Sequence, residues 1–441
     1  MKYTIAQGKE KINSIGGLAL IGLLLKRSGL KREIQKAGTG GSREVKRISD
    51  VLSQAVGLIS QGRTDYNDIE LFRDDELFRD ALEITKVYSE ANLRQRLDEY
   101  AGSYDEEIER SSLSLLGQAS LGTIKTEYGE YIPYDVDVSP FDNSKSNKEG
   151  VSRTYKGTDG FAPIFGYLGT QGYMLNTELR PGKQHCQEGT ATFLREGLAY
   201  LKKLGILDRV LLRMDSGNDA SENIALTLKA GCAFVIKRNL RKENKNEWLD
   251  LAKSLGEKTE PRPGKTVYTG TASHRVPAGL VEGEPVELIF EVTERTQNAD
   301  GQELLIPEIK VDTYWTSLGE RAQTIIELYH QHGTSEQFHS ELKSDLDLER
   351  LPSGKFKTNA TFLQLGMLAY NILRRISQGI VALKEIAPVK LNVARRRIRS
   401  VLQDMIYVGC KLVSHAGQKI LKFGRGSPWF RVFRELYASY C

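Results

Sequence analysis

Cysteine is scarce in this 441-residue chain, and the four that it has, Cys186, Cys232, Cys410 and Cys441, form no C-x-x-C pair. This scatter argues against a structural zinc site and against a disulfide framework, and it suits a reducing cytoplasm. The chain also lacks internal repeats and low-complexity segments. We therefore expect a folded cytoplasmic protein whose stability comes from its core.

Long apolar runs are missing as well. The longest, GGLALIGLLL at residues 16–25, is half the length of about 20 residues that a spanning helix needs. It follows charged residues and no small-residue cleavage site comes after it, so we predict a buried helix and not a signal peptide. We expect no membrane partner.

Acidic residues are rare only in the C-terminal part of the chain, at residues 351–441. Residues 351–441 contain 16 Lys and Arg against 3 Asp and Glu, a local net charge of +13. Because the whole chain has a net charge of +5, the other 350 residues carry −8. A basic C-terminal fifth on an otherwise acidic chain indicates a bound polyanion, with an ordinary solvated surface as the alternative.

Hydrophobic periodicity divides the chain into five parts and predicts an α/β fold. Residues 1–120 have apolar positions at helical spacing and predict a helical DNA-binding domain, although a protein-interaction module fits equally. Residues 126–240 predict the first part of an α/β core and residues 241–317 a β-strand insertion. Residues 318–350 return to the core, and residues 351–441 form a basic, mainly helical region.

Within the core the predicted elements follow one another in the order β-β-β-α-β-α-β, which is that of an RNase H-like fold. This order comes from strands at residues 131–140, 161–169, 173–180, 209–215 and 232–239, with helices at 189–204 and 220–230. Residues 240–262 look like a charged linker, and strands at 266–276, 285–296 and 303–315 predict an all-β insertion. Helices at 358–379 and 392–408, a hairpin around Gly417 and a terminal helix close the chain.

The first predicted core strand carries two acids, Asp135 and Asp137. Alternate residues of a strand face the same side, so these acids share one face while Tyr134 and Val136 share the other. Like charges so close raise each other's pKa unless a cation lies between them. The pair indicates a metal site, with a solvent-facing edge strand as the alternative.

A further acid, Asp215, ends the apolar strand LLRM just before Ser216 and Gly217. Open α/β sheets place their sites at the carboxyl ends of inner strands. Asp215 is therefore a candidate site residue, and a turn or helix-capping aspartate is the alternative.

The third candidate acid is Glu336, which lies between Tyr329 and Lys343. Thr334 and Gln337 match a capping box, so a helix is predicted to begin there. Glu336, His339 and Lys343 would then share a helix face, on which a carboxylate can bind metal and a lysine can contact phosphate.

Two alternatives remain for this segment. Glu327 or Glu341 fits the role of the notable acid as well as Glu336 does. His332, Glu336 and His339 also permit a zinc or di-iron site, although no second histidine motif completes it.

Together these motifs resemble the DDE transposases of bacterial insertion sequences, and nearly the whole chain is similar to the insertion-sequence 1380 family. YDVDVS resembles the family's first-aspartate strand and LRMDSG its second, which implies that Asp137 and Asp215 are catalytic. The spacing Y-x-x-R-x-x-x-E-x-x-x-x-x-x-K of the wider clan is matched by Tyr329, Glu336 and Lys343, with His332 in place of the arginine.

The resemblance implies an RNase H-like core with a β-strand insertion, and a metal-dependent nuclease and strand transferase. Asp137, Asp215 and Glu336 would hold two Mg²⁺ ions, with Asp135 as an alternative ligand and Mn²⁺ as a substitute metal. Tyr329, His332 and Lys343 would position phosphates. The partners would be double-stranded DNA, as transposon ends and target, and a second copy of the chain.

Basic and aromatic side chains outside this triad are predicted to contact DNA, which makes binding steeply dependent on salt. Trp315 would stack on a flipped base, with a core tryptophan as the alternative. The basic candidates, for which a solvated face is the alternative, are Lys237, Arg238, Arg374, Arg375, Arg395, Arg396, Arg397 and Arg399.

Two other functions fit the same residues. A different RNase H-like nuclease would share the acids but would not need the basic tail, the insertion or strand transfer. A DNA-binding relative without catalysis would explain His332 in the arginine position, although all three acids are present.

Overall fold

The computed structural model describes residues 1–38, 41–272, 277, 279–280, 285–298 and 300–441. The chain forms two compact units. Unit 1 comprises Met1–Ala119, Phe141–Val151 and Ser340–Cys441, and unit 2 comprises Ser120–Pro140 and Ser152–His339.

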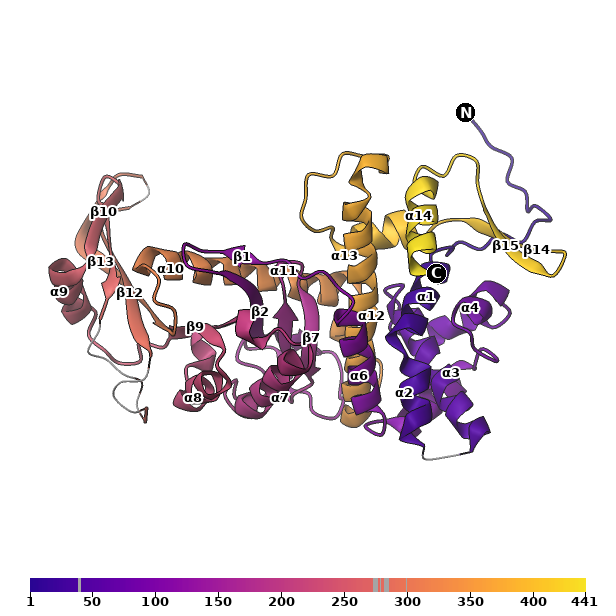
Figure 1. Ribbon diagram of the computed structural model, residues 1–441, viewed down its shortest axis with the longest axis horizontal. Coiled ribbons are helices and arrows are strands. Elements are labelled where there is room, and N and C mark those ends of the chain that lie inside the picture. Colours follow the sequence, from indigo (N-terminus) through magenta and orange to yellow (C-terminus); the bar gives the residue numbers. More distant parts are fainter. Residues whose placement is uncertain (39–40, 273–276, 278, 281–284, 299) are drawn as a thin grey trace. The chain divides into compact units, whose positions relative to one another are not determined.

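Unit 1 is mainly helical, and its longest helix, α12, contacts α1, α3, α5 and α6 (Figure 1). Helix α1 is buried, which confirms the buried helix predicted from residues 16–25. No helix of the described residues is both long and apolar enough to cross a membrane. The elements of unit 1 are α1 (Leu18–Ser28), α2 (Leu30–Ala37), α3 (Ser42–Ile59), η1 (Tyr66–Phe72), α4 (Glu76–Ala81), α5 (Glu90–Tyr100), α6 (Asp105–Leu116), β3 (Phe141–Asp142), η5 (Glu341–Asp345), η6 (Leu348–Arg350), α12 (Phe356–Ala382), η7 (Lys384–Ile386), α13 (Ile398–Val401), η8 (Leu402–Ile406), β14 (Cys410–His415), β15 (Gln418–Phe423) and α14 (Phe430–Tyr440).

Unit 2 is a mixed α/β structure around one large sheet. Its elements are β1 (Ile124–Lys125), β2 (Glu130–Val138), β4 (Ser152–Arg153), β5 (Asp159–Phe161), β6 (Ile164–Leu168), β7 (Tyr173–Glu178), α7 (Thr190–Lys203), η2 (Leu207–Arg209), β8 (Val210–Met214), η3 (Ser216–Asn218), α8 (Ser221–Ala230), β9 (Ala233–Arg238), α9 (Lys245–Leu255), β10 (Glu257–Arg262), β11 (Lys265–Thr271), β12 (Glu287–Gln297), β13 (Glu303–Thr316), α10 (Ala322–His330), η4 (Gln331–Thr334) and α11 (Ser335–Ser340). The predicted order β-β-β-α-β-α-β is confirmed by β2, β6, β7, α7, β8, α8 and β9.

Within the described residues the large sheet runs β10-β11-β12-β13-β9-β8-β2-β6-β7, with β1 paired to β2. Strands β2, β8 and β9 are parallel neighbours, while β6 pairs antiparallel with β2 and β7 pairs antiparallel with β6. The strands β2 and β8 therefore end at the same edge of the sheet.

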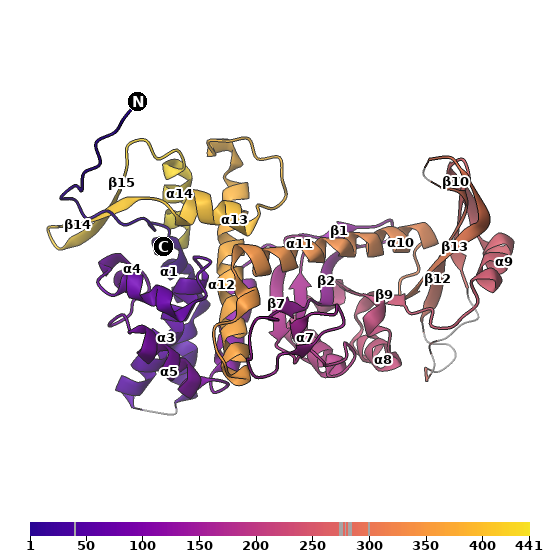
Figure 2. The same ribbon diagram turned by 180° about the vertical axis from the view of Figure 1, so that it is seen from behind.

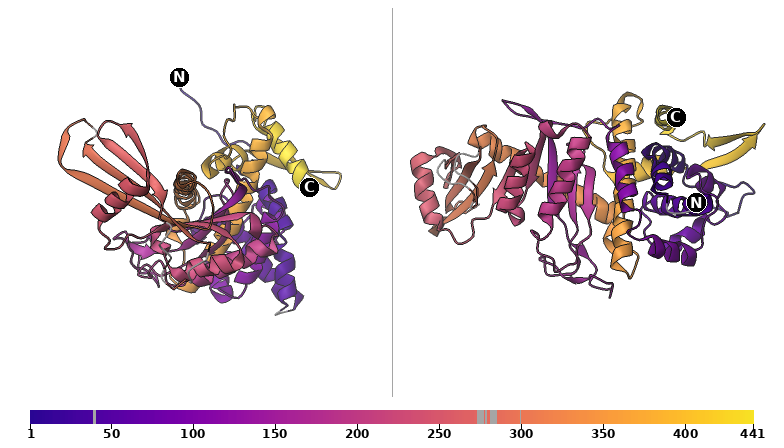
Figure 3. Two further views of the ribbon diagram at one scale, coloured as in Figure 1. Left: turned by 60° about the vertical axis from the view of Figure 1, so that its left-hand side comes forward. Right: turned by 60° about the horizontal axis from the view of Figure 1, so that its bottom comes forward.

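Helices cover both faces of this sheet, with α7 and α8 on one face and α10 and α11 on the other (Figures 1 and 3). The α7 face holds Tyr134, whose hydroxyl donates to Asn176 Oδ1 over 2.9 Å. On the α10 face, Ile325 and Leu328 pack with Leu211 of β8 in a buried apolar cluster. Alternate side chains of β2 therefore face different helices, as strand geometry predicts: one set faces α7 and the other faces α10.

The segment predicted as a linker and an all-β insertion is built differently. A helix, α9, occupies part of the predicted linker, because Trp248, Leu249 and Ala252 recur at helical spacing and are buried. Strand β13 pairs with β9, so the extra strands extend the core sheet. Of the predicted strand at 266–276, residues 273–276 lie outside the described residues.

The helix expected at residues 392–408 starts only at Ile398 and ends in a π-helical turn, η8. The helix predicted to begin at Thr334 is α11, which starts at Ser335 directly after the 3-10 turn η4. The Thr334 hydroxyl does not cap it, because it donates to the carbonyl of Gln331. Figure 2 shows α10 and α11 following each other almost without interruption.

Candidate active site

Asp137 and Asp215 lie together at one edge of the sheet. The parallel pairing of β2 with β8 ends at Val136 opposite Met214, and each acid is the residue that follows. Both charges raise the pKa of Tyr155 and of Tyr329, whose hydroxyls are also shielded by burial. The two acids and the two tyrosines thus share one electrostatic environment.

The two carboxylates differ in their protonation equilibria. Burial raises the pKa of Asp215, and the neighbouring charge of Asp137 raises it further. Burial also acts to raise the pKa of Asp137, but the interactions with His339 and His332 and the backbone hydrogen bond from Val138 together outweigh it, and the net shift is downward. A pair of mutually repelling, largely buried carboxylates is a donor set that suits a hard divalent cation.

Asp135, the alternative ligand on the same strand face, is engaged elsewhere. Its two oxygens accept hydrogen bonds from Arg213 Nε and Nη2 at 2.6 and 2.7 Å, and Oδ1 lies 2.9 Å from His332 Nδ1. Arg213 and Asp135 are both almost fully buried, and Arg213 also donates to the carbonyl of Leu328. These bonds occupy both oxygens of Asp135 in an ion pair.

Tyr329, His332 and Glu336 come from the helical segment that crosses this face of the sheet. Tyr329 is half-buried at the end of α10, with its ring centroid 5.8 Å from that of His332. Glu336 is exposed on α11. Among the described residues, no three His, Cys, Asp or Glu side chains gather closely enough to hold a metal ion. This holds for the predicted triad of Asp137, Asp215 and Glu336 as well as for the His332, Glu336 and His339 set.

Lys343 lies beyond α11 in the π-helical turn η5, where its Nζ is 5.7 Å from the ring centroid of Phe141. A π turn contains more residues than an α turn, so the helical phase changes here. The regular α-helical spacing on which the shared face of Glu336, His339 and Lys343 was predicted therefore does not continue through η5, and the Lys343 side chain is partly exposed.

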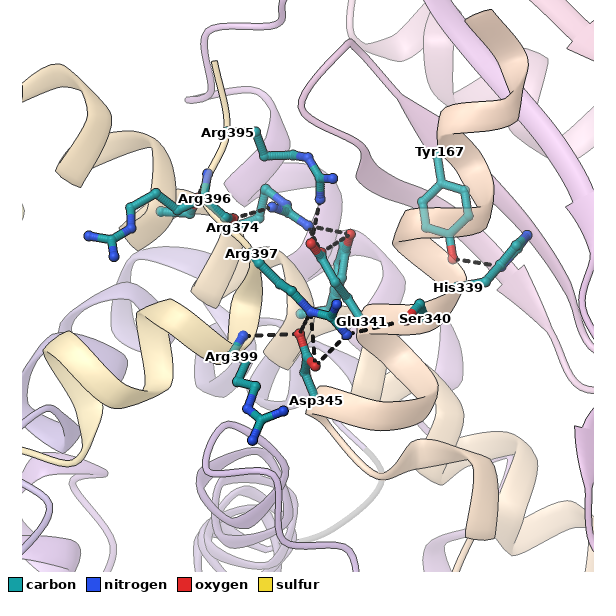
Figure 4. Close-up of polar contacts among 12 residues, drawn as sticks. Tyr167, His339, Ser340, Glu341, Asp345, Arg374, Arg395, Arg396, Arg397 and Arg399 are labelled. Atoms are coloured by element: carbon teal, nitrogen blue, oxygen red, sulfur yellow. Dashed lines mark hydrogen bonds and ion pairs between the residues drawn. The ribbon is translucent and has the colours of Figure 1, made fainter. Parts of the chain in front are cut away.

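Most of the arginines predicted to contact DNA are bound to acids of unit 1 (Figure 4). Arg374 is fully buried and, like Arg395, forms an ion pair with Glu341. Arg397 donates from Nε to Asp345 Oδ2 over 2.8 Å, and Arg396 pairs with Asp404.

Glu341, one of the two alternative acids, is therefore a buried structural carboxylate. The buried guanidinium of Arg374 has no access to a phosphate in this structure, which corrects the interpretation of this residue as a DNA contact. Arg399 is exposed and Arg375 half-buried. In the arginine run, Arg395 and Arg396 are thus half-buried and paired with acids, Arg397 is exposed but paired, and the exposed guanidinium of Arg399 has no acid partner among the described residues.

The basic and aromatic candidates of unit 2 are also held by neighbours. Trp315 is buried, and its indole N–H donates to Asp219 Oδ1 over 3.1 Å, so the structure agrees with a core tryptophan and not with base stacking. Arg238 lies over the Trp315 ring and pairs with Glu243. Lys237 pairs with Asp312 over 2.7 Å.

Two residues of this region, Arg213 and Tyr167, were not predicted as site residues, and His339 was considered only on the face of Glu336 and as a ligand of a zinc or di-iron site. A charged residue inside the apolar strand LLRM was a signal for Arg213, because a buried charge needs a partner. Tyr167 gave no such local signal, since its bond to His339 joins positions 172 residues apart.

The family model described as Transposase DDE domain group 1 matches residues 4–440. The chain therefore belongs to this family of DDE transposases, whose DDE domain is that of DNA-cutting and DNA-joining enzymes. Among solved structures, the chain is similar to piggyBac transposase in a synaptic complex with hairpin DNA, determined by cryo-EM. The two are 12% identical with a TM-score of 0.42, over 88% of this chain and 79% of that chain. A comparison with the curated proteins finds no match.

Proposed function

We propose that this chain is a DNA transposase that cuts at transposon terminal inverted repeats and joins the 3′-hydroxyl ends to target DNA. The observation that carries the proposal is the pairing of Asp137 with Asp215 at the shared end of two parallel strands. Membership of the DDE transposase family indicates the type of reaction. The Asp137 and Asp215 pair is where we propose that this reaction takes place.

The topology of unit 2 supports an RNase H-like core. Its strands β7-β6-β2-β8-β9 follow the order 3-2-1-4-5 in chain sequence, with one helix in each connection that follows the third strand. Strands β10–β13 and α9 then form the proposed insertion. The motifs around Asp137, Asp215 and Glu336 support the narrower assignment to the insertion-sequence 1380 family.

Asp137, Asp215 and Glu336 are the residues that we propose to hold two Mg²⁺ ions, with Mn²⁺ as a substitute. When bound, these ions would activate the attacking oxygen and stabilise the leaving oxygen. Asp137 and Asp215 supply oxygen ligands from the strands, and Glu336 supplies an exposed carboxylate from α11. Tyr329 and Lys343 remain proposed phosphate contacts.

The DNA would meet basic side chains that no acid neutralises. Arg399 is exposed, and no ion pair joins its guanidinium to an acid of the described residues. It is our first choice for a phosphate contact outside the active site, followed by Arg375. Two transposon ends must be cut together, so we propose a homodimer on DNA, in the cytoplasm at the nucleoid.

Joining of pre-cut DNA tests the proposed function. The substrate is a duplex that ends in the inverted repeat flanking the gene, with a free 3′-hydroxyl, incubated with plasmid and Mg²⁺. We expect covalent joining of the end to the plasmid, and complete loss of joining when a chelator removes the divalent ion.

The two alternative functions give different results in the same assay. A resolvase or repair nuclease would nick DNA with Mg²⁺ but would join no ends. A DNA-binding relative without catalysis would shift the end DNA in a gel and neither nick nor join it. Either result would contradict the proposed function.

A further inference from the structure

Two histidines connect the helical segment of Glu336 to the strand of Asp137. His332 Nδ1 lies 2.9 Å from Asp135 Oδ1, and His339 Nε2 lies 3.1 Å from Asp137 Oδ2. Both carboxylates project from the same face of β2, and both histidines are buried. The segment is therefore attached to the strand at two points seven residues apart.

The hydrogen bond between His339 and Asp137 has a defined donor and acceptor. An ionised carboxylate only accepts hydrogen bonds, so His339 Nε2 donates to Asp137. The other ring nitrogen, Nδ1, lies 3.1 Å from the hydroxyl of Tyr167, so both ring nitrogens have hydrogen-bond partners. The rings of Phe165 and Tyr167 lie 5.3 and 5.2 Å from that of His339 and fix its plane.

Glu336 lies between these two attachments, four residues after His332 and three before His339. Residues at these spacings are neighbours on a helix surface. Among the described residues, no hydrogen bond or ion pair holds the Glu336 carboxylate itself. Its place relative to Asp137 is thus set by the backbone that the two histidines fix.

We propose that His332 and His339 are positioning residues that fix the backbone of the Glu336 segment to β2, so that the Glu336 carboxylate can turn toward Asp137 and share a metal ion with it. The inference rests on the proposed function, because it takes Glu336 and Asp137 as metal ligands. A histidine in the arginine position of the clan's motif is then a structural contact to Asp135. The competing explanation is that both histidines only satisfy hydrogen bonds in the core. In that case replacing them would not change the effect of a Glu336 substitution on metal binding.

Amide side chains provide matched variants. Asn places its N–H near the position of histidine Nδ1, and Gln places its N–H near Nε2. The variant H332N/H339Q therefore keeps both donors, whereas the swapped variant H332Q/H339N has the same composition with both donors misplaced. H332L/H339L removes both hydrogen bonds.

The test is a double-mutant cycle on Mn²⁺ binding to the full chain, measured from the electron paramagnetic resonance signal of free Mn²⁺. In the native chain we expect Glu336→Gln to weaken Mn²⁺ binding by more than about tenfold. Loss of a residue that only supports a metal ligand already costs about tenfold or more in affinity, and loss of a direct ligand should cost at least as much. In H332L/H339L the same substitution should have almost no effect, and in H332N/H339Q its effect should return. If H332L/H339L fails to fold, as its unfolding temperature would reveal, the swapped variant replaces it.

The outcomes separate the two claims. An equal effect of Glu336→Gln in the native, leucine and swapped backgrounds would overturn the positioning role and leave the metal site intact. No effect of Glu336→Gln in the native chain would overturn both the positioning role and Glu336 as a ligand. If Glu336→Gln weakens Mn²⁺ binding only in the native and H332N/H339Q backgrounds, where both donors are kept, the result supports both the positioning role and Glu336 as a ligand.

Discussion

Replacing Asp215 by asparagine should reduce DNA cleavage and end joining by on the order of a thousandfold or more. The variant loses a charge of the proposed metal site. Bound metal ions supply several kcal/mol of transition-state stabilisation, and each 1.36 kcal/mol is tenfold in rate. The measurement is the single-turnover rate of end cleavage at saturating Mg²⁺.

Stability provides the control for this variant. Asn keeps the side-chain oxygen that accepts from the backbone N–H of Gly217 and from Asn218 Nδ2. It also removes a charge that burial and Asp137 make unfavourable. We therefore expect an unfolding temperature without divalent ions no lower than that of the native chain. An Asp215→Asn variant that still cleaved at the native rate would show that Asp215 is not a catalytic ligand.

Replacing Arg213 by methionine should lower the free energy of unfolding by about 3–5 kcal/mol, the usual cost of removing one partner of a buried ion pair. The variant leaves the Asp135 carboxylate buried without its two guanidinium hydrogen bonds. It also removes the donor to the carbonyl of Leu328, which ties β8 to α10. Urea unfolding followed by circular dichroism measures the effect.

A second substitution identifies the cause. In Arg213→Met combined with Asp135→Asn, no uncompensated charge remains, so part of the lost stability should return. Equal destabilisation of the single and double variants would contradict this explanation, because the buried charge of Asp135 would then not be what makes Arg213→Met unstable.

Local patterns in the sequence were enough for much of unit 2. Strand alternation predicted that Asp135 and Asp137 share a face, and the buried strand before Asp215 predicted its place at the sheet edge. Helix α9 was missed because its many charged residues hide the spacing of Trp248 and Ala252.

The partners of the site residues could not be predicted in the same way. Asp135 and His332 are 197 residues apart, and Arg395 and Glu341 are 54 apart, so no local pattern relates them. The sequence favoured Asp137 only through the family resemblance and left Asp135 as an alternative ligand. The fold distinguishes them, because Arg213 stands opposite Asp135 on β8 while Asp215 follows next to Asp137.

The central claim is that Asp137, Asp215 and Glu336 form one metal-binding triad, and Glu336 is the member whose carboxylate no contact yet fixes. End cleavage by Glu336→Gln, compared with Glu327→Gln, tests it most directly. Glu327 is a matched control, because it is also exposed and lies in the same helical segment. We predict that Glu336→Gln loses cleavage by on the order of a thousandfold, while Glu327→Gln cleaves like the native chain. Native-like cleavage by Glu336→Gln would contradict the triad.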